Sequence, residues 1–458
     1  MSKAAHSKDG AQGSTLGELA RILFDIKFAA LDAATLDAVR ARVLDALGAL
    51  VVGLQTPEGR VLRRYAQRAS GRGGTLDFAE RCRLYVGAAR ATEVDDIDVA
   101  SCTTVGSVVV PVALGVAARR SLADPRTLLA AVVAGYEAMQ RLGRAIGGAT
   151  LIYRGVWPTY VTAPFAAAAT AAKLLELDAA ATARALALAL TRTSSVPAAA
   201  LSRSGFRYYS LGCAAVEGAD AASAAAAGVE ADQDALAAFA ERIGAGLDAA
   251  LVHAAGEPWL VREVDSKPWP TSRQALASVA AFRALELAPA SIDAIERIVV
   301  GVPGAYRAMI DRAAPPAQRI ESMIGVQYQV ALAALTPDKL YDAIRTEVPA
   351  PPELASLMAK IEVRADEALD ARFPRRWGSR VTVRFGSGEE RTHEVLDPDG
   401  AAARPLDLDG VERKYARIFA ASNVDKADWL GAARERCEQL ARAAGDVGLV
   451  ADLWASIE

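Results

Sequence analysis

The stretch Asp265-Ser266-Lys267-Pro268-Trp269-Pro270-Thr271 divides the chain into two parts of different character. Two prolines placed two residues apart cannot lie inside a helix, because each removes a backbone donor and clashes with the preceding turn. Helical patterns fill the sequence before this stretch, and strand patterns appear only after it. The stretch therefore indicates a junction between two structural units.

The part before the junction has the pattern of packed helices. Apolar residues recur at helical spacing between Leu36 and Val51, and Gly53 suits the end of that helix. Asp124-Pro125 is typical of a helix cap followed by a first-turn proline. Alanine-rich stretches at 166–172 and 221–227 favour helices that approach one another closely. We therefore expect a large helical domain.

The part after the junction alternates helix and strand. Residues 297–302 and 360–364 have the composition of strands. Residues 380–385 and 389–395 flank the turn Gly386-Ser387-Gly388, which predicts a hairpin. Helical periodicity returns from Leu406.

Together these patterns predict a mostly α chain with an inserted α+β domain. We expect a flexible tail at 1–14, a helical domain from 15–264 and 401–458, and a smaller lid domain at 265–400. The chain has 458 residues, which suits two domains rather than one.

Composition excludes several classes of function. The net charge of -3 and the pI near 5.9 provide no positive electrostatic field that would attract nucleic acid. No apolar run is long enough to span a membrane. The four cysteines have no zinc or disulfide spacing, and His6, His253 and His393 lie far apart in sequence. We therefore predict a cytoplasmic protein with no metal site and no histidine-centred catalysis.

Short segments in a fixed order carry a resemblance to a known family. They are Asp45-Ala46-Leu47-Gly48, Glu93-Val94-Asp95-Asp96-Ile97, Gly106-Ser107, Ala134-Gly135-Tyr136-Glu137, Arg154-Gly155-Val156-Trp157-Pro158, Gly212-Cys213-Ala214-Ala215, Lys267-Pro268-Trp269-Pro270, Gln327-Tyr328 and Lys414-Tyr415. In this order and spacing the chain, from about residue 16 to 450, resembles the MmgE/PrpD family, which includes 2-methylcitrate dehydratase, cis-aconitate decarboxylase and iminodisuccinate epimerase. The resemblance implies a cofactor-free enzyme, usually a homodimer, with its site between a helical domain and a lid. It also implies proton abstraction next to a carboxylate of a small-molecule substrate, followed by loss of water, loss of carbon dioxide or reprotonation.

The chain departs from the family pattern at the histidines. Thr103 or Thr104 stands at one histidine position, and Trp157 stands at another. Arg207 replaces a lysine, which keeps the charge but removes a possible base. The other departures are Glu93 for an aspartate, Ile97 for a threonine, Ser210 for a histidine, and Arg273 and Gln274 where a lid histidine is usual. These changes predict a pocket that is less polar than the family's usual one. They therefore also predict a substrate with less charge than citrate-like acids.

Ten residues are candidates for the site. Those with possible catalytic roles are Lys267, Glu93, Tyr328 and Asp95, and those with possible substrate-binding roles are Arg207, Trp157, Thr103, Thr104, Arg154 and Asp96. Lys267 or Glu93 could be the base, and arginines bind carboxylates in a bidentate fork. Each candidate also has a purely structural interpretation. Asp95 and Asp96 are adjacent and should point in different directions, so at most one of the two should face the site.

Three functions remain open from the sequence. The first is a lyase or isomerase that abstracts a proton next to a carboxylate or carbonyl of a small organic acid or a less polar derivative. The second is a non-catalytic family member that binds a small molecule or a protein. The third is new chemistry on the same scaffold, such as cyclisation or isomerisation. Fold alone does not decide among them.

Overall fold

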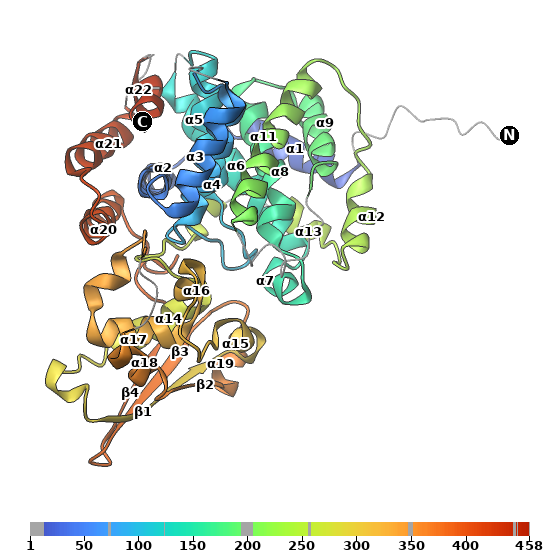
Figure 1. The fold of residues 1–458 in the computed structure, drawn as a ribbon. Helices are drawn as coiled ribbons and strands as arrows, with labels where there is room; N and C mark the ends of the chain where they lie inside the picture. The colour runs from blue at the N-terminus through green and yellow to red at the C-terminus, as the bar shows by residue number, and fades with distance from the viewer. Residues whose placement is uncertain are drawn as a thin grey trace.

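The computed structural model describes residues 13–71, 75–122, 124–193, 205–254, 258–346, 351–442, 446 and 448–457. It has a large helical domain and a smaller domain with a sheet, which lies below the helices in Figure 1. The helices predicted from the renewed periodicity after Leu406 are present, and they pack against α2 and α5. No helix in the described ranges is both long and apolar enough to cross a membrane.

In the part of the chain that the structure describes, the helical domain is built mainly from α-helices, with three short 3-10 turns. The helices are α1 (Thr15–Asp25), α2 (Ala33–Gly53), α3 (Pro57–Ala69), α4 (Phe78–Ala91), α5 (Gly106–Arg119), α6 (Pro125–Ala145), α7 (Gly148–Leu151), α8 (Pro158–Leu174), α9 (Ala179–Leu190), α11 (Phe206–Ala226), α12 (Ala235–Arg242), α13 (Ala249–His253), α20 (Leu408–Ala421), α21 (Ala427–Gln439) and α22 (Leu449–Ala455). The 3-10 turns are η2 (Phe28–Ala30), η3 (Ile152–Arg154) and η4 (Leu260–Glu263).

The predicted helix ends are confirmed. Helix α2 ends at Gly53, and the Asp124 carboxylate caps α6 by accepting from the backbone N–H of Arg126. The alanine-rich stretches lie in α8 and α11, which pack against each other. A Cβ on Gly218 of α11 would come within 2.2 Å of the Pro164 carbonyl oxygen of α8, so only glycine permits this approach.

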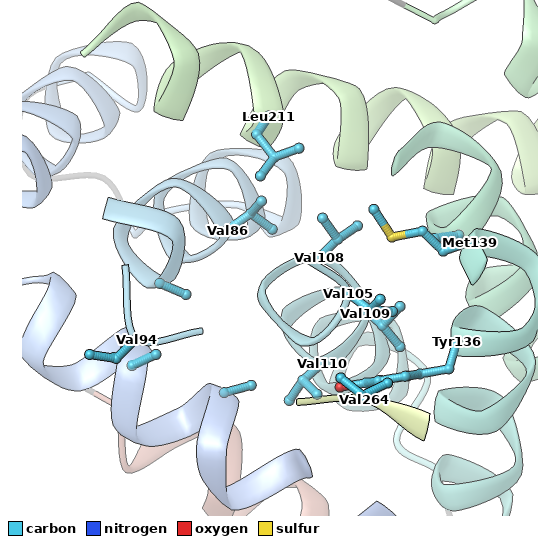
Figure 2. Packing of buried hydrophobic residues seen from close by; sticks show 14 of the residues in the cluster. Val86, Val94, Val105, Val108, Val109, Val110, Tyr136, Met139, Leu211 and Val264 are labelled. Carbon is cyan, nitrogen blue, oxygen red and sulfur yellow. The ribbon is translucent and has the colours of Figure 1, made fainter. Parts of the chain in front are cut away.

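The core of the helical domain lies between α4, α5, α6 and α11. Figure 2 shows Val86, Val108, Met139 and Leu211 converging there. Their side chains are fully shielded from solvent, which is the main source of stability for a helical domain.

The smaller domain surrounds a four-stranded sheet. Its elements are α14 (Arg273–Arg283), η5 (Pro289–Ser291), β1 (Ile295–Val302), α15 (Gly304–Ile310), α16 (Arg319–Ile324), α17 (Val326–Leu335), η6 (Pro337–Tyr341), α18 (Pro352–Met358), β2 (Ile361–Ala365), α19 (Glu367–Asp370), β3 (Ser379–Phe385) and β4 (Glu390–Val395). The strand order is β2-β1-β3-β4, with β1 parallel to β2 and antiparallel to β3. The predicted strands and the hairpin β3–β4 are confirmed. Helix α14 packs against β1, β3 and β4.

Candidate active site

Two loops cross at the boundary of the domains and bring Glu93 and Lys267 together. The loop after α4 and the junction stretch pair through Ile97 and Asp265, whose N–H groups each donate to the other's carbonyl oxygen at 2.9 Å. The Thr271 N–H donates to the Glu93 carbonyl oxygen at 3.1 Å. Val94 and Val264 anchor the two loops by inserting into the core, as Figure 2 shows.

The crossing creates a buried cluster of five charged side chains. Glu93 lies 2.5 Å from Arg207, 2.9 Å from Arg90 and 3.5 Å from Lys267. Asp95 accepts from Lys267 at 2.9 Å and lies 3.3 Å from Arg90. None of these side chains is more than 6% exposed. Each carboxylate is therefore shared between cations in a medium that screens charge poorly.

A cavity of about 270 Å³ opens beside the cluster, between the two domains. The helical domain contributes Arg90, Glu93, Ile97, Cys102, Thr104, Ile152, Tyr153, Trp157, Thr159 and Arg207, and the junction and smaller domain contribute Lys267, Ser272, Arg273, Gln274, Met309, Arg312 and Ile324. A small cavity between domains, with a few convergent polar groups and apolar walls, is typical of a binding site for a small molecule.

Two helices begin at the cavity wall. Helix α8 follows Trp157 and α14 follows Ser272, and neither preceding side chain makes a capping hydrogen bond. Helix N-termini carry partial positive charge and favour anions. The hydroxyl groups of Thr104 and Ser272 are buried and have no hydrogen-bond partner among the described residues. The wall therefore offers positive potential and unused hydrogen-bonding groups.

Strained backbone marks the same wall. Glu93 and Cys102 both have φ near +54°, in the left-handed region that non-glycine residues rarely adopt. Such a conformation costs on the order of 1 kcal/mol or more and persists only where the surroundings enforce it. The pairing of the two crossing loops supplies that constraint.

The protonation states in the cavity follow from burial and charge. Burial alone would raise the pKa of Glu93, but Arg90, Arg207 and Lys267 outweigh it and hold that pKa well below its usual range. Burial raises the pKa of the Cys102 thiol to about 12 and also raises the pKa of the Tyr153 phenol. Glu93 is therefore an anion at neutral pH, while Cys102 and Tyr153 keep their protons.

The structure brings six of the ten candidates together. Glu93, Asp95, Arg207 and Lys267 form the charged cluster, and Trp157 and Thr104 line the cavity. The ring of Trp157 also lies against the Arg207 guanidinium, 5.4 Å from the ring centre. Asp95 and Asp96 were expected to point in different directions. Asp95 joins the charged cluster, and Asp96 does not.

The other four candidates lie outside the cavity wall. Arg154 is exposed and donates to the Gly244 carbonyl oxygen. The Thr103 hydroxyl pairs with Ser101, and Tyr328 is buried in α17. Asp96 caps α5 by accepting from the N–H groups of Gly106 and Val105. Arg154, Thr103 and Asp96 therefore hydrogen-bond to other parts of the protein, and Tyr328 is part of the buried core.

Sequence reasoning missed Arg90 and Ser272. Arg90 stands near the end of α4, three residues before Glu93, and this short separation in sequence could have indicated the pair. Ser272 gave no comparable signal, because its role depends on where α14 begins relative to the other domain. Within the described ranges, no group of His, Cys, Asp and Glu side chains is placed to hold a metal ion.

The buried Asp96 carboxylate makes stability depend on pH. Burial raises its pKa from the ordinary 3.8 to about 6, although hydrogen bonds from Tyr136 and Gly106 act in the opposite direction. The folded protein therefore binds more protons than the unfolded chain between these values. The contribution of Asp96 to stability is present below pH 3.8 and is lost as the pH rises through about 6.

We expect Asp96→Asn to be more stable than the wild type at about pH 8, by roughly 1–3 kcal/mol, because the amide keeps an acceptor for the α5 N–H groups without the cost of a buried charge. The advantage should shrink towards about pH 4, where the native carboxyl is protonated. Urea unfolding of both proteins at the two pH values measures this difference. A variant that is less stable than the wild type at the higher pH contradicts the argument.

Comparison with known proteins gives matches to two family models and no match to a curated protein. The family model for the MmgE/PrpD N-terminal domain matches residues 17–245, and the model for the MmgE/PrpD C-terminal domain matches residues 269–434. The two matches meet at the junction stretch that carries Lys267. No curated protein matches the chain.

Proposed function

The chain belongs to the MmgE/PrpD family, and from this premise we propose that it is a lyase or isomerase that removes a proton next to the carboxylate or carbonyl of a small organic acid. The observation that carries the proposal is the buried cluster of Glu93, Arg90, Arg207 and Lys267 on the wall of a small cavity between the domains. The family resemblance also supports a cytoplasmic homodimer that needs no cofactor.

Arg207 is the proposed anchor for the substrate carboxylate. Its guanidinium lines the cavity and contacts Glu93 at 2.5 Å and the Tyr208 hydroxyl at 2.7 Å. A planar guanidinium has donors enough to hold a carboxylate while keeping one of these partners. Trp157 and Tyr208 stack against it and limit its movement. An arriving carboxylate therefore competes with Glu93 for Arg207.

Glu93 is the proposed base. It is the one carboxylate among the described residues of the cavity wall, and Cys102 and Tyr153 are protonated. In the free protein its cations make it a weak base. When a substrate carboxylate takes Arg207, the stabilisation of the Glu93 anion decreases and its pKa rises towards the ordinary value. Substrate binding thus strengthens the base where it is needed.

Lys267 and Arg90 are the proposed stabilisers of the charge that develops on the substrate. Removing a proton next to a carboxylate builds negative charge on its oxygens, and cations fixed in advance lower the barrier. Asp95 holds both cations, at 2.9 Å from Lys267 and 3.3 Å from Arg90. Asp95 therefore positions these groups without contacting the substrate. Tyr328 has no part in this proposal, because it lies outside the cavity wall.

Binding without catalysis is the second candidate function. The observation in its favour is that the acidic and basic groups of the wall are already paired with one another, or protonated, in the free protein. A site of this kind binds an anion readily. It catalyses only if binding breaks a resident ion pair, as proposed for Arg207 and Glu93.

Deuterium uptake separates the two functions. We would incubate the wild type in heavy water with mono-, di- and tricarboxylic acids, including cis-aconitate and 2-methylcitrate, and follow mass changes. We expect uptake, or loss of water or carbon dioxide, with at least one acid. Lys267→Met should lower the rate by about 10²–10³-fold, since it keeps the length of the side chain and removes the ammonium group.

Lys267→Arg is the matched control, because it restores the charge and should recover part of the rate. Both variants must first show a wild-type circular dichroism spectrum. If the folded wild type binds an acid without any exchange or mass change, the enzymatic proposal is wrong and the binding function is supported.

A further inference from the structure

The cluster beside the cavity has one positive charge in surplus. Among the residues that the structure describes, the acidic partners of Arg90, Arg207 and Lys267 are Glu93 and Asp95, and all five side chains are buried. An uncompensated charge in such surroundings is costly, so the cluster favours a ligand that brings one negative charge. A second buried carboxylate would leave a surplus of the opposite sign.

The remaining cations of the wall do not change this count. Arg273 is neutralised by Asp265 at 2.6 Å. Arg312 is exposed at the cavity, and its Nε donates to the Met309 carbonyl oxygen. A hydrated cation of this kind contributes only about 0–1 kcal/mol to an ion pair, so it tolerates a second carboxylate without selecting for one.

The uncharged residues of the wall indicate which other groups the ligand carries. The unpartnered hydroxyls of Thr104 and Ser272 can each donate and accept, which suits a neutral hydroxyl or carbonyl group. Ile97, Met309 and Ile324 offer only apolar contact. The volume of about 270 Å³ is roughly nine times the ~30 Å³ share of one water molecule, so the ligand has on the order of ten non-hydrogen atoms.

We propose that the site selects a small acid with a single carboxylate, one uncharged hydroxyl or carbonyl group and an apolar remainder. The carboxylate lies against Arg207 and Lys267, and the neutral polar group lies against Thr104 and Ser272. Selection among ligands is a property of binding. The inference rests on the proposed function only for what happens to the ligand after it binds.

Titration calorimetry with the full chain tests the selection. The probes are β-hydroxybutyrate, malate and citrate, which carry one, two and three carboxylates. We expect β-hydroxybutyrate to bind at least about tenfold more tightly than malate, and malate more tightly than citrate, because each further buried carboxylate meets no free cation. Wild-type protein that binds malate or citrate as tightly as β-hydroxybutyrate overturns the inference.

Glu93→Gln makes the test specific to the charge count. The variant raises the surplus from one to two, so malate should gain at least about tenfold in affinity relative to β-hydroxybutyrate. An unchanged order of affinities in folded Glu93→Gln overturns the inference. The matched control is Arg442→Gln, which changes an exposed arginine paired with Glu438 near the end of α21 and should leave the order as in the wild type.

A second variant covers the case in which Glu93→Gln fails to fold. Arg207→Gln removes the surplus, so β-hydroxybutyrate should lose its advantage over its uncharged amide. Retention of that advantage counts against the inference. The outcomes also separate this inference from the proposed function. A monocarboxylate that binds without deuterium exchange removes only the proposed function, and exchange confined to dicarboxylates removes only the inference.

Discussion

Replacing Glu93 with glutamine is expected to lower kcat by about 10²–10⁴-fold, the range found when a general base is removed. KM should not rise, because the change removes a negative charge from a wall that binds an anion. This pattern, a lost rate without lost binding, is the one expected of a group that acts in the transition state. Steady-state rates with the acid that shows the fastest exchange provide the measurement.

The substitution keeps the shape of the side chain and removes the basic group. Glutamine has the same shape as glutamate and keeps one oxygen acceptor for Arg207, while its amide nitrogen stands where the second carboxylate oxygen meets Arg90. A wild-type circular dichroism spectrum of the variant therefore accompanies the rate measurement. Glutamine cannot take a proton from carbon. Burial of Glu93 at 5% exposure also means that solvent cannot readily substitute for it as a base.

The control is Glu217→Gln, which changes an exposed glutamate paired with Arg192 on the helical domain. Its kcat should stay within about twofold of the wild type, as is usual for surface substitutions. If Glu93→Gln retains more than about a tenth of the wild-type kcat, Glu93 is not the base. Lys267 would then be the next group to test for that role, because it lies 3.5 Å from Glu93 on the same wall.

The elements of the fold follow from local physics, and for that reason the sequence predicts them well. Period-two alternation with a Gly-Ser-Gly turn predicted the hairpin β3–β4, and the paired prolines predicted the break before α14. These signals act over a few residues. They do not depend on what packs on the far side of the element.

The site could be predicted only in part, because it depends on how two distant loops cross. Glu93 and Lys267 were found from their positions in collinear motifs, but the depressed pKa of Glu93 comes from Arg90 and Arg207, which lie on different helices. Motif position also gives no side-chain direction. Tyr328 matched the motif, and yet it does not line the cavity. The surplus charge is visible only once all five side chains are placed.

A second polar network lies directly behind the site and fixes the same two loops. Lys414 donates to the Asp45 carboxylate and to the Val94 carbonyl oxygen, the latter at 2.8 Å. Asp45 also accepts from the Ser266 hydroxyl at 2.8 Å and from the Tyr415 hydroxyl at 3.0 Å. Val94 and Ser266 are the immediate neighbours of Glu93 and Lys267. The network therefore joins α2 and α20 to the backbone that carries the charged cluster.

Lys414→Met is expected to destabilise the protein by about 3–5 kcal/mol, because it leaves the buried Asp45 carboxylate without its cation. Urea unfolding at neutral pH gives the free energy, and Lys339→Met, at an exposed position in η6, should change it by no more than about 0.5 kcal/mol. Asp45→Asn combined with Lys414→Met should cost less than the sum of the single changes, since the pair is lost only once. A loss below about 1 kcal/mol for Lys414→Met would show that Arg42, which reaches Ser266 at 2.6 Å, compensates Asp45 by itself and that the network does not hold the loops.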